Sequence, residues 1–241
     1  MAIIYGPLQD IASRFIIMIF KNKKYITFDC YGTLIDWEGG IRKAIKKLSD
    51  KNSFNLDLNG ITDKYIKAEL KVEAEKYRKY HEVLQLSAKK LLKERGFDIS
   101  DDDALEFANS IYSWQPFPET HATLVRLKEK GYKLIILSNI DNEIIKRSIA
   151  LMEIDFDGVV TAEEVGSYKP AYGHWQEMLK RFNAKKEEVL HVAASYIHDI
   201  IPAKEQGFDA VWINRNNEKP TREIRPDMEF ADLIKLPEIL A

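Results

Sequence analysis

The sequence of 241 residues contains a single cysteine, Cys30. One cysteine excludes an internal disulfide framework and a metal site built from several cysteines, and it is typical of a reducing compartment, so we expect a cytoplasmic location. The formal net charge is −2, from 36 Lys and Arg against 38 Asp and Glu. This balance excludes the broad positive field that drives non-specific binding to nucleic acid or to an anionic membrane surface. We therefore expect no nucleic-acid partner, and any basic site has to be local.

A long hydrophobic run is also absent. The apolar run at residues 15–20 is far shorter than the roughly 20 residues that span a bilayer, so we expect no membrane span. It is a poor signal peptide, because no basic leader precedes it and no small-residue cleavage site follows it. We interpret it as a packed N-terminal helix, with a peripheral membrane anchor aided by Lys21, Lys23 and Lys24 as the alternative.

The composition is otherwise that of a globular protein. Hydrophobic residues make up 45% of the chain, and the length allows one large domain or a core with a smaller addition. Charged residues make up 31%, which exceeds the norm of about 25% and favours a thermophilic source.

Short apolar runs alternate with helical patterns along much of the chain. The runs lack the in-and-out alternation of an exposed sheet, so they predict buried parallel strands at 25–28, 132–137, 158–161, 189–192 and 210–213. The intervening patterns predict helices at 119–130, 141–152, 171–183 and 200–206. This alternation predicts an α/β fold with a doubly wound, Rossmann-like parallel sheet, in which ligands bind at the carboxyl ends of the strands.

Residues 37–118 depart from that alternation, because their patterns are all helical. An apolar stripe predicts one long helix over residues 61–95, and Ser100 has the residue type that caps the next helix. We predict an α/β core domain at 1–36 and 119–241, with 37–118 inserted after the first strand as an all-helical cap. Such a cap would exclude water from the strand ends.

Asp29 stands where the first predicted strand ends, and Gly32 allows the backbone to turn around its carboxylate. A carboxylate held in such a turn can act as a nucleophile, forming an ester or acyl-phosphate that water later cleaves. A lone Asp at a strand end is more commonly a turn or helix cap. The motifs that follow it favour the nucleophile.

Four motifs in chain order resemble those of the haloacid dehalogenase superfamily, and particularly its type II (L-2-haloacid dehalogenase-like) branch. They are Phe-Asp-Cys-Tyr-Gly-Thr-Leu at 28–34, Ile-Leu-Ser-Asn at 136–139, Tyr-Lys-Pro at 168–170, and His-Val-Ala-Ala-Ser at 191–195 leading to Asp199. The helical insert matches the position of the cap in that family.

The resemblance implies a set of catalytic roles. Asp29 corresponds to the nucleophile, and Thr33 would orient it through a hydroxyl hydrogen bond. Lys169 corresponds to the lysine whose positive charge keeps Asp29 ionised and offsets charge in the transition state. Asp199 corresponds to an acid that orients Lys169, positions the hydrolytic water or binds a metal.

The resemblance also implies the residues that bind a small anionic substrate. Ser138 would donate a hydrogen bond to the anionic group, with Asn139 beside it; a helix N-cap is the alternative for Ser138. Ser195 and Tyr31 are further candidates. The family places an Arg from the cap over the halide, and this chain offers cap lysines there, of which we select Lys67; a solvated helix charge is its alternative.

Two further positions stay open. His198, beside Asp199, is either a pH-sensitive base or a packed histidine. The aromatic group that the family supplies after Lys169 is either Tyr172 or Trp175, with core packing as the alternative.

The residue types in these motifs discriminate between reactions. The phosphatase branch carries an Asp two residues after the nucleophile, to protonate the leaving oxygen, and often a second acid at the position of Ala194. Here the first position holds Tyr31, and an unperturbed phenol titrates near 10. Halide leaves as a stable anion without a proton or a metal, so the residues favour an (S)-2-haloacid dehalogenase that needs no cofactor.

Two alternatives stay open. One is a phosphatase of small phosphorylated metabolites that requires Mg²⁺, held by Asp29, the Tyr31 carbonyl and Asp199. The other is a degenerate member that binds an anion without turnover, although an intact nucleophile and charge partner argue against it. The sequence leaves a homodimer open.

Overall fold

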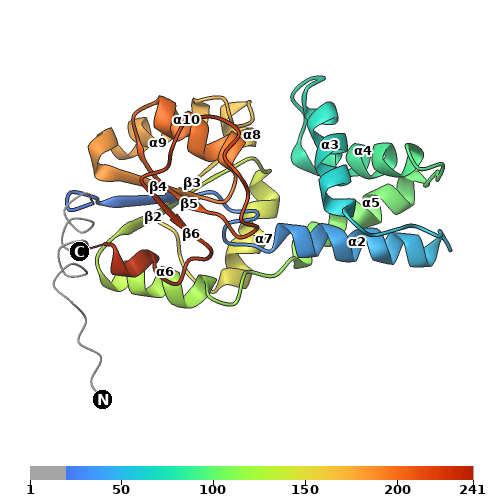
Figure 1. Ribbon diagram of the computed structural model, residues 1–241, viewed down its shortest axis with the longest axis horizontal. Coiled ribbons are helices and arrows are strands. Elements are labelled where there is room, and N and C mark those ends of the chain that lie inside the picture. Colours follow the sequence, from blue (N-terminus) through green and yellow to red (C-terminus); the bar gives the residue numbers. More distant parts are fainter. Residues whose placement is uncertain (1–19, 241) are drawn as a thin grey trace, which may run out of the picture.

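The structure is a computed structural model, and it describes residues 20–240 (Figure 1). The interpretation of residues 15–20 falls outside the described residues except for Phe20, which is buried. Among the described helices, none combines the length and the apolar character that a bilayer crossing needs.

A parallel sheet forms the centre of the α/β part of the molecule. Its strands are β1 (Tyr25–Phe28), β2 (Lys133–Ser138), β3 (Gly158–Thr161), β4 (Val189–Ala193), β5 (Asp209–Ile213) and β6 (Met228–Phe230). The strand order is β3-β2-β1-β4-β5-β6, and every neighbouring pair is parallel. Five of these strands occupy the runs that the sequence predicts. The sixth, β6, was not predicted, because three half-exposed or exposed residues give no apolar run.

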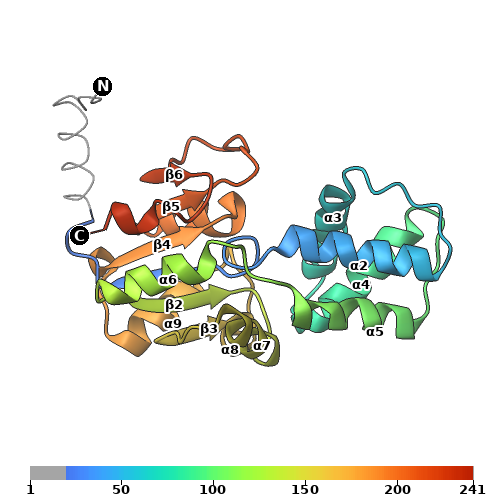
Figure 2. The same cartoon turned by 90° about the horizontal axis from the view of Figure 1, so that it is seen from below.

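Helices cover both faces of this sheet, which confirms the α/β doubly wound prediction (Figure 2). They are α6 (Thr120–Glu129), α7 (Asn142–Met152), α8 (Ala162–Val165), α9 (Gly173–Phe182) and α10 (Ile201–Glu205). Alternate residues of each strand pack on opposite sides. On one side Ile136 joins the core cluster that contains Leu124 of α6, and on the other Leu137 joins the cluster that contains Trp175 of α9. The central strands are therefore buried on both faces, and apart from Thr27 and His191 their polar side chains lie at the strand ends.

A group of helices, here called the cap helices, lies between β1 and α6 in sequence and apart from the sheet in space (Figures 1 and 2). These are α2 (Trp37–Lys51), α3 (Ile61–Glu73), α4 (Tyr80–Lys93), α5 (Asp101–Asn109) and the 3₁₀ helix η1 (Ser110–Ser113). The two chain segments that connect them to the core lie together, since the Asp36 amide donates to the Gln115 carbonyl at 2.9 Å. The Ser100 cap is confirmed, because its hydroxyl accepts a hydrogen bond from the Asp103 amide at 3.0 Å. The domain boundaries at 36/37 and 118/119 stay a prediction.

The prediction of one helix over 61–95 is wrong, because α3 ends at Glu73 and α4 begins at Tyr80. The carboxylate of Asp141, in the core, accepts hydrogen bonds from the Tyr80 and His81 amides at 2.8 and 2.9 Å. The first amides of a helix have no partner within it, so a carboxylate placed there fixes where α4 begins. Hydrophobic periodicity cannot reveal this contact, because Asp141 is distant from α4 in sequence.

Candidate active site

Four predicted catalytic residues, Asp29, Ser138, Lys169 and Asp199, line one cavity of about 160 Å³ between the carboxyl ends of the strands and the cap helices. The fifth, Thr33, does not line it but contacts Asp29. The core supplies Asp29, Tyr31, Ser138, Asn139, Lys169, Ser195, His198 and Asp199. The cap helices supply Trp37, Glu69, Glu73 and Tyr80. Neighbouring parallel strands β1, β2 and β4 end at the same edge of the sheet, which is why residues so distant in sequence converge here.

Both carboxylate oxygens of Asp29 have a partner. Oδ1 accepts from Lys169 Nζ at 2.9 Å, and Oδ2 accepts from the Thr33 hydroxyl at 2.8 Å. The same hydroxyl accepts from the Ala194 amide at 2.8 Å, so Thr33 ties Asp29 to the loop after β4. Gly32 adopts a φ of +94° in the turn, a conformation that costs other residues energy. Burial raises the pKa of Asp29, and the adjacent Lys169 ammonium opposes that rise.

Lys169 is buried, and all three of its ammonium protons are used. Nζ donates to Asp29 Oδ1, to Asp199 Oδ1 at 2.6 Å and to the Leu137 carbonyl at 2.8 Å. Burial by itself lowers the pKa of Lys169, but the Asp199 and Asp29 carboxylates outweigh it and leave the pKa raised. The ammonium is therefore held in its charged form between two acids.

Asp199 is the most strongly acidic of these groups. Burial favours its protonated form, but Lys169 and a hydrogen bond from His191 outweigh burial and lower the pKa of Asp199 to about 2. His191 Nε2 lies 3.0 Å from Asp199 Oδ1, and its Nδ1 lies 2.9 Å from the Thr27 hydroxyl. No role for His191 was predicted from the sequence. The available signal was a polar residue inside the otherwise apolar strand β4.

Asn139 holds the backbone of Lys169. Its side-chain oxygen accepts from the Lys169 amide at 2.6 Å, and its side-chain nitrogen donates to the Lys169 carbonyl at 3.1 Å. His174 also supports the loop after β2, because its Nε2 lies 3.1 Å from the Ser138 carbonyl oxygen. Burial lowers the pKa of His174 to about 3, so it is neutral and donates this hydrogen bond. No role for His174 was predicted from the sequence.

Ser138 is available to a ligand. It is 1% exposed, lines the cavity, and its hydroxyl makes no hydrogen bond within residues 20–240. The helix-cap alternative for Ser138 is wrong, because the N-cap of α7 is Asp141. Ser195 lines the same cavity and also caps the short helix η3 (Tyr196–Ile200), accepting from the His198 amide at 3.1 Å. Burial lowers the pKa of His198.

Tyr31 lies two residues after Asp29 but is turned toward a different partner. Its hydroxyl is 2.6 Å from the Ser148 hydroxyl on α7, and burial raises the pKa of Tyr31 well above its usual range. Neither aromatic candidate after Lys169 lines the cavity: Tyr172 is 40% exposed, and Trp175 packs edge-on against His191 in the core.

Lys67 does not lie at the cavity, so the structure does not support its selection as a substrate-binding residue. It is exposed on α3, and the same helix turns Glu69 and Glu73 toward the cavity. At about 100° per residue, positions 67 and 69 lie about 200° apart around a helix, so only one of them can face the core.

Two of the residues proposed to hold Mg²⁺, Asp29 and Asp199, both contact the Lys169 ammonium. Lys169 Nζ occupies the position between the Asp29 and Asp199 oxygens, at 2.9 and 2.6 Å. Residues 20–240 contain no group of three or more His, Cys, Asp or Glu side chains placed to hold a metal ion. In this arrangement the pair therefore fits the Lys169 ammonium rather than a divalent ion, and Mg²⁺ stays tied to the phosphatase alternative.

Comparison with known proteins places this geometry in a family. The sequence model of the haloacid dehalogenase-like hydrolase family matches residues 23–207 of this chain. The chain is 26% identical over 232 residues to an (S)-2-haloacid dehalogenase from Pseudomonas putida, covering 88% of this chain and 96% of that protein. It is 38% identical over 104 residues to a glyceraldehyde 3-phosphate phosphatase from Methanothermobacter thermautotrophicus, but this match spans only 42% of this chain and 45% of that protein.

A solved structure shares the fold. The L-2-haloacid dehalogenase from Xanthobacter autotrophicus with chloropropionic acid covalently bound superposes with a TM-score of 0.76 at 18% identity, covering 90% of this chain and 98% of that one. The family model spans well over half of the sequence and includes Asp29, Lys169 and Asp199. The chain belongs to the haloacid dehalogenase-like hydrolases.

Proposed function

We propose that this hydrolase is an (S)-2-haloacid dehalogenase that acts through a covalent ester on Asp29. The observation that carries the proposal is the state of Tyr31. A phosphatase needs an acid near this point to protonate the leaving oxygen, but burial raises the pKa of Tyr31 well above its usual range, which makes it a weak acid, and its hydroxyl faces Ser148. A halide ion leaves with its bonding electrons and needs no proton, so carbon–halogen cleavage does not require an acid at Tyr31.

The first step uses the Asp29 carboxylate. One oxygen attacks the carbon that carries the halogen, the carbon–halogen bond breaks, and the halide departs while an ester forms. The contacts from Thr33 and Lys169 fix the carboxylate before attack, so little ordering remains to be done in the transition state. The buried Ser138 hydroxyl donates to the substrate carboxylate, and Ser195 is a further binding residue in this proposal. The polar groups of Asn139 and Tyr31 are engaged with Lys169 and Ser148 instead.

The second step restores the enzyme. Water adds to the acyl carbon of the Asp29 ester, the ester bond breaks, and a 2-hydroxy acid leaves. The lowered pKa of His198 keeps its imidazole neutral in the same cavity, so we assign it as the acceptor of the water proton. Asp199 is a poor base at a pKa of about 2, and its role is to orient Lys169.

The phosphatase remains the second candidate because of the 38% identity to the glyceraldehyde 3-phosphate phosphatase. In that reaction Asp29, the Tyr31 carbonyl and Asp199 would hold Mg²⁺, which screens the repulsion between a carboxylate and a phosphate. A non-catalytic anion binder is the third candidate. The buried contact between Asp29 and Lys169 argues against it, since a binding protein has no use for a poised nucleophile.

A paired assay separates the three candidates. One arm measures halide release from (S)-2-chloropropionate with a chelator present, and the other measures phosphate release from a phosphomonoester with Mg²⁺. Halide release is expected in the first arm and is expected to be lost in Asp29→Asn, whereas Asp155→Asn, the same change at an exposed position, serves as the control. Phosphate release alone would overturn the proposal in favour of the second candidate, and inactivity in both arms would favour the third.

We also propose a cytoplasmic location and a thermophilic source, from the single cysteine and the charged fraction of the sequence. A homodimer is a further possibility that the sequence leaves open, and size-exclusion chromatography with light scattering tests it.

A further inference from the structure

The cap wall of the active-site cavity carries two acids that lack a cation. Glu69 and Glu73 lie one turn apart on α3, and both line the cavity that contains Asp29. Within residues 20–240 neither side chain forms an ion pair, and the only ammonium in the cavity, on Lys169, is used by Asp29 and Asp199.

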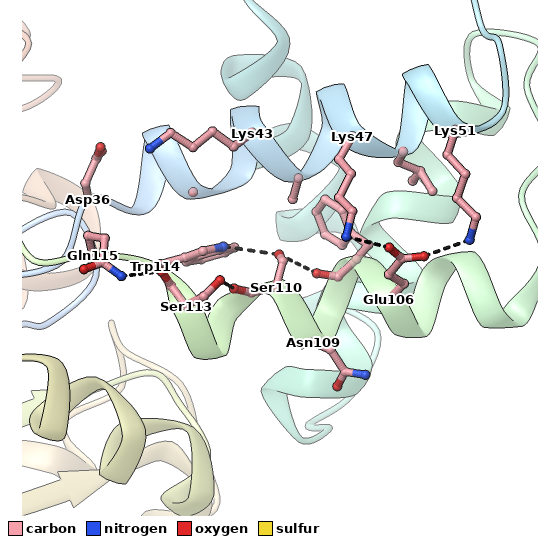
Figure 3. Close-up of a pocket in the computed structure, with 14 residues that line it drawn as sticks. Asp36, Lys43, Lys47, Lys51, Glu106, Asn109, Ser110, Ser113, Trp114 and Gln115 are labelled. Carbon is pink, nitrogen blue, oxygen red and sulfur yellow. Dashed lines mark hydrogen bonds and ion pairs between the residues drawn. The ribbon is translucent and has the colours of Figure 1, made fainter.

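Several other acids in the cap part of the chain are paired with a cation. Glu94 pairs with Lys71 at 2.9 Å, and Glu75 pairs with Arg78 at 2.8 Å. A second cavity, of about 430 Å³ between α2 and α5, also has an acidic side chain in its wall (Figure 3). There Glu106 bridges Lys47 and Lys51, each at 2.7 Å. On these helices Glu38, Asp63 and Asp102 also lack an ion pair within residues 20–240, but they are exposed to solvent. Glu69 and Glu73 differ from them because they are partly buried and line the active-site cavity.

Aromatic side chains surround and orient these acids. The Trp37 indole donates to the Tyr80 hydroxyl at 3.2 Å, and that hydroxyl donates to Glu69 Oε1 at 2.7 Å. The Glu73 side chain makes no hydrogen bond within the described part of the chain. Aromatic rings together with carboxylates provide cation–π and charge-assisted contacts, which is the chemistry that recognises an alkylammonium group.

The opposite wall has a different preference. Ser138 is buried, its hydroxyl has no partner within residues 20–240, and it stands beside Asp29 and Lys169. A hydroxyl donor near an ammonium suits an anionic group. The cavity therefore has an anion-binding core wall and an acidic, aromatic cap wall.

We propose that Glu69 and Glu73, framed by Trp37 and Tyr80, bind an ammonium group on the end of the substrate that points away from Asp29. Resting on the proposed function, this narrows the substrate class to small 2-haloalkanoic acids whose side chain carries an amino group. These residues determine specificity and take no part in bond breaking.

The electrostatics of the acids agree with this role. Burial and the charge of Glu73 raise the pKa of Glu69 to about 8, and burial raises the pKa of Glu73 to about 7. The raised values mean that the ionised forms are disfavoured while no cation is present. A bound ammonium supplies the missing charge and restores both carboxylates to the ionised state.

Binding of stable product analogues tests the inference without turnover. The first probe pair is (R)-4-amino-2-hydroxybutanoate and (R)-2-hydroxypentanoate, in which a methyl group replaces the ammonium. The second pair, 2-aminoethyl phosphate and propyl phosphate, poses the same question for a phosphate substrate. Calorimetry on the full chain measures the Kd of each probe. In the pair whose anionic group, carboxylate or phosphate, is bound by the core wall, we expect the ammonium compound to have a Kd about tenfold or more below that of its methyl counterpart.

Variants assign the preference to the two acids. Glu69→Gln with Glu73→Gln is expected to abolish the ammonium preference, and Glu94→Gln, whose pair with Lys71 lies outside the cavity, is expected to retain it. Thermal melting of each variant shows that it is folded. The inference fails if wild type shows no ammonium preference in either probe pair, or if the double variant keeps that preference.

These outcomes are distinguishable from failure of the proposed function. Ammonium preference without halide release from any 2-haloacid leaves the specificity assignment standing and overturns the dehalogenase. Halide release without ammonium preference supports the dehalogenase and overturns the specificity assignment.

Discussion

Replacing Lys169 with methionine is expected to damage stability and catalysis together. The change keeps most of the side-chain volume but removes hydrogen bonds to Asp29, Asp199 and the Leu137 carbonyl. Removing one partner from a buried ionic group leaves a buried charge without a counter-charge, and this lowers the unfolding free energy by about 3–5 kcal/mol. Because Asp29 loses its counter-charge, its pKa rises further and less nucleophile is ionised, so kcat/KM should fall about a hundredfold or more.

The stability loss should depend on pH with a definite sign. In wild type the lowered pKa of Asp199 contributes stability above its unfolded value of about 4, and this contribution is lost as pH falls toward 2. In Lys169→Met this contribution from Asp199 is small, because the ammonium that lowers its pKa is gone. The difference in unfolding free energy between wild type and variant should therefore be largest near neutral pH and narrow between about pH 4 and pH 2.

Urea unfolding across this pH range, with halide-release kinetics at neutral pH, checks the prediction. Lys67→Met is the matched control, because Lys67 is exposed and lies outside the cavity. Its stability is expected to change by less than about 0.5 kcal/mol. If Lys169→Met unfolded at the wild-type urea concentration near neutral pH, the reasoning on the buried Asp29–Lys169–Asp199 contacts would be refuted.

Three further substitutions probe the site by standard kinetics and denaturation. Tyr31→Phe should keep halide release within about threefold while losing about 1 kcal/mol of stability with the Ser148 contact, and a drop in kcat beyond about tenfold would instead identify Tyr31 as a proton donor. Asn139→Ala should lower kcat about tenfold with a smaller effect on KM, because the Lys169 backbone loses both of its hydrogen bonds to this side chain; an unchanged kcat contradicts that role. Gly32→Ala should lower the unfolding free energy by about 1–2 kcal/mol, because Gly32 has a φ of +94° that Ala adopts only with strain. A steric clash does not contribute, since the added Cβ would come no closer than 3.9 Å to Ala194. An unaltered urea midpoint would show that the turn relaxes.

Much of the core could be predicted from local sequence. The apolar runs placed β1 to β5, because a strand covered on both faces has to be apolar along its length. The polar residues that end these runs, Asp29 after β1 and Ser138 in β2, then had to meet at one edge of the sheet. The motif residues Lys169 and Asp199 proved to contact Asp29 and each other as a connected set.

Supporting contacts were harder to predict, because they join a side chain to a distant backbone or to another buried side chain. Asn139 was expected to bind substrate, yet its amide is engaged with the backbone of Lys169. His191 supports Asp199 from within a strand, where periodicity marks it only as one more buried position.

The sequence by itself determined the positions of five strands with the polar residues at their ends, the nucleophile motif and the helical character of the insert. Each of these depends on neighbours within a few residues. Tertiary structure alone decided what the cap presents to the site. Periodicity identifies an apolar stripe on α3 but does not say which of its polar flanks will face the core. The contact of Asp141 with the start of α4 breaks the expected long helix, and Glu69 and Glu73, rather than Lys67, line the cavity. The charge of the cap wall therefore follows from how two separate parts of the chain are set against each other.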